Sequence, residues 1–342
     1  RGTSELLPWL RQYIFPLERE FQGQKARQET SAFFAELARH GTTTAMLYTA
    51  IYEDSAEAAF HSAAKSGLRV IMGKMMMDVG SYGNLMPTKI VSISLHESER
   101  LCKKWHGANE GLLEYAFSPR FAVACSEKML RGAAELAQAH GAYVQTHLAE
   151  NQEEIEKVKH QFPWAQDYTD IYDRCGLLTT RTVLGHCVHL SERERAALAS
   201  TGASVAHCPT ANLFLSSGIM PVDTMRESGV RLGLGTDMAA GPELNLWRVM
   251  RCAIDSQEAR SFYQGGVSVA TPGDALHLAT QGGADALGKG DVIGSLTPGK
   301  DADLTIMNHA ALLPYRSGPG ATPNLSAEDV LSLCVYRGGP DA

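Results

Sequence analysis

Short apolar, β-branched runs alternate with longer helical stretches along most of this chain, and this alternation constrains the fold more than any other feature. Helical segments such as 125–140 and 190–200 lie between the runs. Strands that alternate with helices are typical of a parallel sheet covered by helices, so we predict an α/β fold. The runs lie at 42–49, 69–77, 112–119, 142–147, 182–188, 203–209 and 231–237.

The number of runs narrows the architecture. Seven strands with short connections fit either an open doubly wound sheet or most of a (β/α)₈ barrel, and a barrel needs eight. The first 40 residues read as two helices with no strand before them, and the chain begins at Arg1. We therefore expect a TIM-like barrel whose first strand is absent from this sequence, which would then be part of a longer translated product.

The pattern changes near residue 290. Helices are predicted at 243–260 and 273–287, and turn residues followed by a short strand are predicted within 294–308, with a loop at 314–324. We expect a (β/α) barrel over 1–290, and a partial C-terminal β-sandwich segment with its connecting loop over 291–342.

Composition excludes several classes of function. The net charge is −7 and no basic stripe is visible, so nucleic-acid binding has no electrostatic support. No apolar run approaches the ~20 residues that span a bilayer. Seven cysteines without a C-x-x-C pair argue against a disulfide framework, and we expect a reduced, cytoplasmic compartment.

Side chains that can bind a metal ion lie at the ends of three predicted strands. His147 ends the run at 142–147, His186 lies near the end of 182–188, and Asp237 ends 231–237. In a barrel the carboxyl ends of all strands converge on one face, where these side chains would meet. Two imidazoles and a carboxylate suit Zn²⁺ or Fe²⁺ with an open position for water. The metal would lower the pKa of that water toward ~7.

Glu150 follows His147 by three residues. There it would reach the same pocket without ligating the metal, and it could take a proton from the activated water and pass it to a leaving group. Each residue also has a plainer interpretation. A histidine at a strand end is often a hydrogen-bonded structural residue, Asp237 could cap the next helix, and Glu150 could begin an exposed acidic helix face. The combination of the residues favours a site.

Other histidines are weaker candidates. His189 lies past its strand and reads as a loop residue or one behind the ligands. His207 and Cys208 sit at another strand end, where they could line the pocket or shape a loop with Pro209 and Asn212.

Four motifs, in this order and spacing, resemble the amidohydrolase superfamily: "THLAEN", "LGHCVHLS", "AHCPTANLFLSSG" and "GLGTDMAAG". The segment "GSLTPGKDADLTIMN" is similar to that superfamily's return to a small β-sandwich. Within the superfamily the guanine deaminases show the closest likeness, through "LLPWLRQYIFPLEREF", "HGTTTA", "SPRFAVACSEKML" and "HLAENQEEIEKVK". The resemblance covers nearly the whole chain.

This resemblance implies a reaction. A metal-activated water would convert guanine to xanthine and ammonia, with Glu150 relaying the proton and Asp237 both ligating the metal and orienting the water. Arg120 and Phe121 of "SPRF" would hold the purine, the guanidinium by its fork of donors and the ring by stacking. Without the resemblance, Arg120 would be read as paired with a carboxylate and Phe121 as core. The family also implies a homodimer.

One departure from the family pattern is large. The family takes two further metal ligands from a His-x-His at the end of its first strand, and a glutamine just after it contacts the substrate, but no such motif occurs here. If the molecule began at Arg1, we would expect weak metal binding and little activity. Two alternatives therefore stay open: a related amidohydrolase for another aminated or chlorinated nitrogen heterocycle, and a metal-free barrel that serves as a binding scaffold.

Overall fold

The centre of the molecule is a seven-stranded sheet in which strand order follows the sequence from β1 to β7. The computed structural model describes all residues except 1–4, 81–86, 266–269, 314–323 and 341–342. All six neighbouring pairs are parallel. The strands are β1 (Thr44–Thr49), β2 (Arg69–Met76), β3 (Leu113–Pro119), β4 (Tyr143–Leu148), β5 (Thr182–His186), β6 (Ser204–His207) and β7 (Arg231–Leu234).

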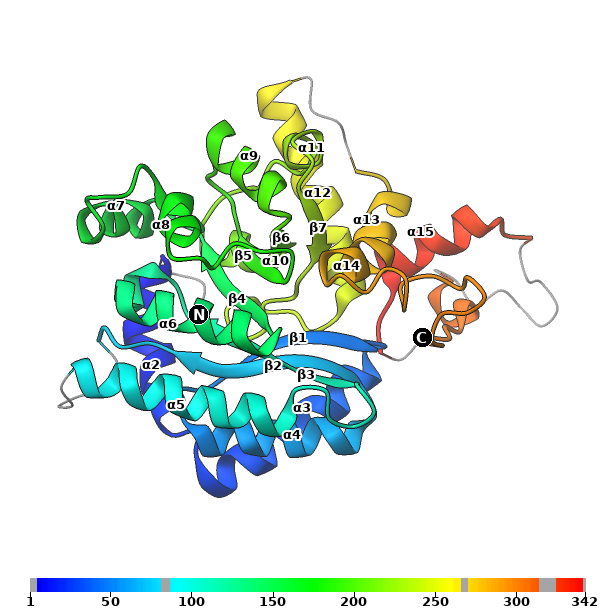
Figure 1. Cartoon of the computed structure of the whole chain (residues 1–342). Coiled ribbons are helices and arrows are strands. Elements are labelled where there is room, and N and C mark those ends of the chain that lie inside the picture. The colour runs from blue at the N-terminus through cyan, green and yellow to red at the C-terminus, as the bar shows by residue number, and fades with distance from the viewer. Residues whose placement is uncertain (1–4, 81–86, 266–269, 314–323, 341–342) are drawn as a thin grey trace.

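The sheet curls into most of a barrel wall and carries its helices on the outside (Figure 1). This confirms the predicted α/β, TIM-like architecture. Six of the strands lie within their predicted runs, and β4 extends one residue beyond its run, to Leu148. Among the described residues, β1 and β7 do not pair with each other. The sheet therefore has two edges and is not a closed ring.

Helices form in every range where the sequence predicts one, but the helix predicted at 273–287 is divided into two, Pro272–Ala279 and Gln281–Ala286. Helices α3, α4 and α5 cover β1–β3 at the bottom of the view in Figure 1, and α15 packs against α12 and α13 through Val335. None of the described helices is long and apolar enough to cross a membrane. The helical elements are α1 (Leu6–Trp9), η1 (Leu10–Ile14), α2 (Phe15–Arg19), α3 (Gly23–Arg39), α4 (Glu53–Ser66), α5 (Pro87–Trp105), η2 (Ala122–Ala124), α6 (Glu127–His140), α7 (Gln152–Gln161), α8 (Tyr168–Arg174), α9 (Glu192–Thr201), α10 (Pro209–Phe214), α11 (Val222–Glu227), α12 (Leu246–Gln264), α13 (Pro272–Ala279), α14 (Gln281–Ala286), η3 (His309–Leu312) and α15 (Ala327–Arg337).

Side-chain caps fix where the helices after the strands begin. Ser126 accepts a hydrogen bond from the Met129 amide at the start of α6. Asn151 with Glu154 forms a capping box at the start of α7, and Ser191 with a glutamate does the same at α9. Each cap satisfies amides that the first helical turn leaves unpaired, so the loop between strand end and helix is short and fixed.

Strand register determines which side chains point into the barrel. Neighbours in a parallel pair share a face, and alternate residues along a strand point to opposite faces. From the pairings of β1 to β5, the side of the sheet that carries His147 also carries Tyr48, Gly73, Ser118 and Gly185. Gly73 is required there, because a Cβ at this position would lie 1.7 Å from the Ala116 carbonyl oxygen.

The short strand expected within 294–308 does not form. Asp301 Oδ2 instead accepts from Arg69 Nη2 at 2.6 Å, and Asp303 Oδ2 accepts from Thr44 Oγ1 at 2.8 Å. These bonds tie the segment by its side chains to the starts of β1 and β2. A strand needs a partner strand for its backbone, and the described residues supply none here. The division at residue 290 stays a prediction, and residues 314–323 of the predicted loop lie outside the described residues.

Candidate metal and proton-transfer site

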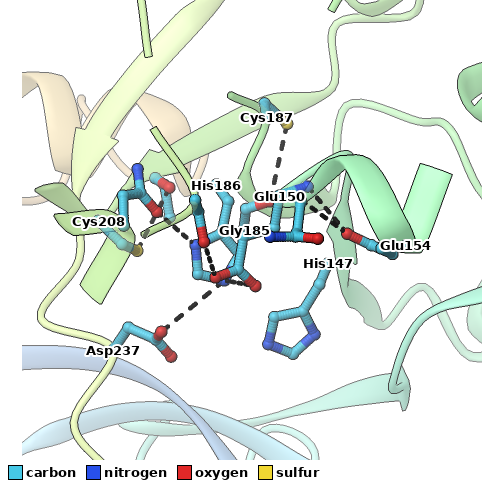
Figure 2. A network of polar contacts seen from close by, with 12 residues as sticks. His147, Glu150, Glu154, Gly185, His186, Cys187, Cys208 and Asp237 are labelled. Carbon is cyan, nitrogen blue, oxygen red and sulfur yellow. Dashed lines mark hydrogen bonds and ion pairs between the residues drawn. The ribbon is translucent and has the colours of Figure 1, made fainter. Parts of the chain in front are cut away.

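Three strand ends bring His147, His186 and Asp237 together, as the sequence predicts. One ligand atom from each of these residues lies within 4.8 Å of the others. Figure 2 shows the three side chains converging from β4, β5 and the segment after β7. The gaps of about 40 and 50 residues between them are closed by the parallel sheet, which places all strand ends on one side.

Backbone and ring contacts orient the His147 imidazole. Its Nδ1 lies 2.6 Å from the carbonyl oxygen of Arg120. A carbonyl can only accept, so Nδ1 carries the proton and Nε2 keeps a free lone pair. The Tyr48 ring stacks on the imidazole with centroids 4.8 Å apart. Burial, reinforced by neighbouring His186, lowers the pKa of His147 to about 3. The ring is therefore neutral at physiological pH, as a metal ligand must be.

His186 reaches the site through an unusual backbone. In register it lies beside Leu148, on the face opposite that of His147. Its φ of +69° and the φ of +50° at Cys187 break the alternation at the strand end. The imidazole Nδ1 lies 2.8 Å from Asn212 Oδ1, which leaves Nε2 for the site.

The charges around His186 compete. Burial lowers its pKa, but the carboxylates of Glu150 and Asp237 outweigh burial and raise it. His186 Nε2 lies 3.4 Å from Glu150 Oε2 and 3.8 Å from Asp237 Oδ2. A cation among these groups would take over the charge balance that a proton on the imidazole otherwise provides.

Asp237 lies three residues beyond β7 and also has a left-handed backbone, with φ of +49°. It does not cap the next helix, because Asn245 caps α12. Its Oδ2 atom is buried and has no hydrogen-bond partner among the described residues. A buried carboxylate oxygen without a donor is costly, and a metal ion is a ligand that would satisfy it.

Glu150 is not a surface residue, since it is only 2% exposed. Ser217 Oγ donates to its Oε1 at 2.8 Å, while Oε2 faces His186. Burial, with the nearby Asp237 charge, raises the pKa of Glu150, against the opposing effects of His186 and Ser217. A raised pKa makes the ionised carboxylate a stronger base, which suits a group that accepts a proton and then passes it on.

The structure places Arg120 and Phe121 directly after β3, beside His147. The plainer interpretation of both residues also fits their contacts: Arg120 Nη1 bonds both carboxylate oxygens of Glu18 at 2.8 Å, and Phe121 is buried in the core. The Phe121 ring nevertheless meets the His147 ring edge-on, with centroids 6.5 Å apart. The pair therefore borders the ligand cluster.

Sequence reasoning missed several residues that orient the site. Asn212 and Ser217 belong to α10 and the turn after it, and each bonds one site side chain. Tyr48 could have been found from the inward alternation of its strand, but nothing in the sequence marks Ser217. His189 is a loop residue whose Nε2 bonds the Ser217 carbonyl at 2.7 Å. His207 is buried at the end of β6, and neither ring nitrogen has a hydrogen-bond partner among the described residues.

The donor set fits a divalent transition metal. The site offers two imidazole nitrogens, each from a ring that can be neutral, and one carboxylate oxygen without a hydrogen-bond partner among the described residues. Zinc and ferrous iron accept such ligands in proteins. The partners behind these ligands, the Arg120 carbonyl and Asn212, fix both imidazole tautomers, as is usual around metal centres.

The chain is similar to proteins of known family and structure. The model of the amidohydrolase family matches residues 1–330. A guanine deaminase of Escherichia coli is 37% identical over 310 residues, which cover 90% of this chain and 68% of that protein. The structure of a guanine deaminase from C. acetobutylicum with bound guanine superposes with a TM-score of 0.91 at 28% identity, over 99% of this chain and 78% of that one.

A further solved structure carries a metal. An adenosine deaminase from Xanthomonas campestris with bound zinc superposes with a TM-score of 0.80 at 27% identity, over 99% of this chain and 73% of that one. Curled parallel sheet, convergent ligand set and buried carboxyl thus occur together with a family match that extends over most of the sequence. The chain belongs to the amidohydrolase family.

Proposed function

We propose that this protein hydrolyses guanine to xanthine and ammonia. The observation that carries the proposal is the buried Glu150, whose Oε2 lies 3.4 Å from His186 Nε2 beside the His147, His186 and Asp237 cluster. A buried, ionisable carboxyl beside a metal-competent set suits hydrolysis by an activated water. The similarity to guanine deaminases, one of them solved with bound guanine, supports the choice of substrate.

His147, His186 and Asp237 hold the metal in this proposal, with zinc preferred and iron second. The zinc in the related adenosine deaminase structure supports that order. When bound, the metal supplies Lewis acidity and a water acidic enough to attack at neutral pH. Asp237, whose buried Oδ2 has no hydrogen-bond partner among the described residues, would also orient that water.

Glu150 moves the protons. Its Oε1 is fixed by Ser217, so Oε2 would accept the first proton of the attacking water and give it to a ring nitrogen of the purine, where it stays. Oε2 would then take the second proton, from the hydroxyl formed at C2, and give it to the departing amine. Arg120 and Phe121, which lie beside His147, bind the purine. Guanidinium donors fit a purine carbonyl and ring nitrogen, and the Phe121 ring offers an apolar face.

We also propose that the protein acts in the cytoplasm as a homodimer and binds neither nucleic acid nor membrane. All seven cysteines are free, which suits a reducing compartment. The net charge of −7 disfavours contact with phosphate backbones. Light scattering on the purified protein tests the dimer, and a monomer mass would refute it.

Guanine turnover, followed as ammonia release from zinc-supplemented protein expressed from the complete reading frame, tests the function. Xanthine and ammonia in equal amounts are expected. Bound zinc without turnover would mean that the substrate is wrong, and a panel of adenosine derivatives and triazines would follow. Absence of both zinc and turnover would refute the enzyme and favour the binding scaffold.

Asn212→Ala is expected to weaken metal binding by about 10–100-fold, because loss of a partner behind a ligand has this effect in other metal centres. Asn212 holds the His186 tautomer that leaves Nε2 free. Zinc affinity measured by chelator competition checks the result. Asn245→Ala is the matched control: it removes a buried asparagine that caps α12, so it should lower stability and leave zinc affinity unchanged.

A further inference from the structure

We propose that α2 is part of the substrate site, where Glu18 and Phe15 position the Arg120 guanidinium to bind the 6-oxo group of the purine. The proposal rests on the proposed function, in which Arg120 contacts substrate. It adds two positioning residues that lie more than 100 positions before Arg120 in the sequence, on a helix outside the barrel strands.

Two different contacts hold the guanidinium. Glu18 receives both of its hydrogen bonds from one nitrogen, Nη1, at 2.8 Å to each carboxylate oxygen. The Phe15 ring centroid lies 5.1 Å from Arg120 Cζ, within range for a cation–π contact. The two residues are three positions apart on α2 and therefore share one face of the helix. One helix face thus fixes both the direction and the plane of the guanidinium.

These contacts leave two nitrogens of the Arg120 guanidinium available to bind a ligand. Among the described residues, every hydrogen bond of the guanidinium is made by Nη1, to Glu18 and to the Met77 sulfur. The Nε and Nη2 donors remain for a ligand. Two parallel N–H groups held in a plane are the arrangement that recognises an oxygen and an adjacent acceptor.

The position of this ion pair argues against a purely structural anchor. Arg120 is 7% exposed, and its backbone carbonyl orients the His147 imidazole. An almost buried ion pair gains little stability over apolar packing, because both charges lose water. A guanidinium beside the ligand cluster would also be repelled by a bound cation unless an anion held it. Glu18 supplies that anion.

Glu18→Gln tests the proposal through binding as well as turnover. Two purine probes are titrated into metal-loaded protein: hypoxanthine, which has the 6-oxo group, and unsubstituted purine, which lacks it. We expect the variant to bind hypoxanthine about 10-fold more weakly, the cost of one misplaced charge-assisted hydrogen bond, and to bind purine within about 2-fold of the parent. The KM for guanine should rise by the same factor, with kcat nearly unchanged.

Glu20→Gln is the matched control. Glu20 lies two residues away and pairs with Lys25 at 2.8 Å on the surface, so its replacement should change neither probe. Equal weakening of both probes by Glu18→Gln, or a lower melting temperature with unchanged KM, would overturn the positioning role. Wild-type protein that binds both probes equally would overturn it too. Probe discrimination that depends on Glu18 in a protein without guanine turnover would leave the positioning role standing and remove the proposed function.

Discussion

Glu150→Gln is expected to lower guanine turnover by about 10³–10⁴-fold while the metal content stays at the wild-type level. Glutamine keeps the size of the side chain and an oxygen that accepts from Ser217 Oγ, so the local structure should persist. It cannot accept a proton, and positioned acid–base catalysis contributes up to about 10⁴-fold to such reactions. The measurement pairs ammonia release with zinc determination by elemental analysis on the same sample.

Glu153→Gln serves as the control for this experiment. Glu153 is an exposed glutamate in the first turn of α7, three residues after Glu150, so both substitutions remove the same charge from the same segment. We expect its turnover to be close to that of the wild type. If Glu150→Gln retained normal turnover, the proton-transfer role assigned to Glu150 would be wrong. If it lost zinc as well as activity, Glu150 would belong to the ligands instead.

The sequence predicts the strands and helices of the barrel wall well. Each strand is marked by a short apolar run, and each helix by apolar residues that recur at helical spacing. It also predicts that His147 points inward, since the alternation of its strand is regular. His186 is different. Its alternation points to the opposite face, and only the left-handed backbone at His186 and Cys187 brings the imidazole to the site. Histidine adopts a left-handed backbone more often than most residues, but that conformation is still uncommon and nothing in the sequence marks His186 and Cys187 for it.

Contacts between segments that are far apart in the sequence also cannot be predicted from the sequence. Glu18 and Arg120 are separated by 102 positions, and Ser217 and Glu150 by 67. Nothing in either short stretch identifies its partner, since a serine after a six-residue helix or a glutamate on an amphipathic helix is ordinary by itself. The expected strand within 294–308 failed for a related reason, because a strand depends on a neighbour that its own sequence does not specify.

Residues with a left-handed backbone orient site side chains that the regular strand geometry would point elsewhere. Four of the non-glycine residues with positive φ are Ala149, His186, Cys187 and Asp237, and each is at or beside a site residue. Such conformations cost free energy, and the surrounding contacts must offset it. Ala149 is held by the Val188 and His189 amides, which both donate to its carbonyl oxygen at 3.1 Å. Sequence reasoning locates the strand ends, and these bonds then aim the side chains.

Asp237→Asn is expected to weaken metal binding by at least about 100-fold and to remove turnover at micromolar zinc. The two side chains have the same shape, but the neutral amide loses the charge that attracts the cation. Loss of a residue behind a ligand already costs up to about 100-fold, so loss of a direct ligand should cost more. Chelator competition measures the affinity, and ammonia release across a zinc titration measures the activity.

Thermal unfolding separates this effect from damage to the fold. Burial raises the pKa of Asp237, which means that the ionised carboxylate is unfavourable in the metal-free protein. Replacement by asparagine should therefore leave the melting temperature of the metal-free protein unchanged or slightly higher. Added zinc stabilises only a protein that binds it, by an amount that grows with the ratio of zinc concentration to Kd. Zinc should therefore raise the melting temperature of the wild type and not that of Asp237→Asn.

Asp223→Asn is the control variant, and it should affect stability without affecting zinc binding. Asp223 is a partly buried aspartate that pairs with Arg260 at 2.7 Å and is not among the three clustered ligands. Its replacement should lower the melting temperature of metal-free protein, because Arg260 loses its partner, while the increase on adding zinc stays intact. An Asp237→Asn protein that still gained stability from zinc would show that the metal is held by other residues, and the three-residue ligand set would have to be abandoned.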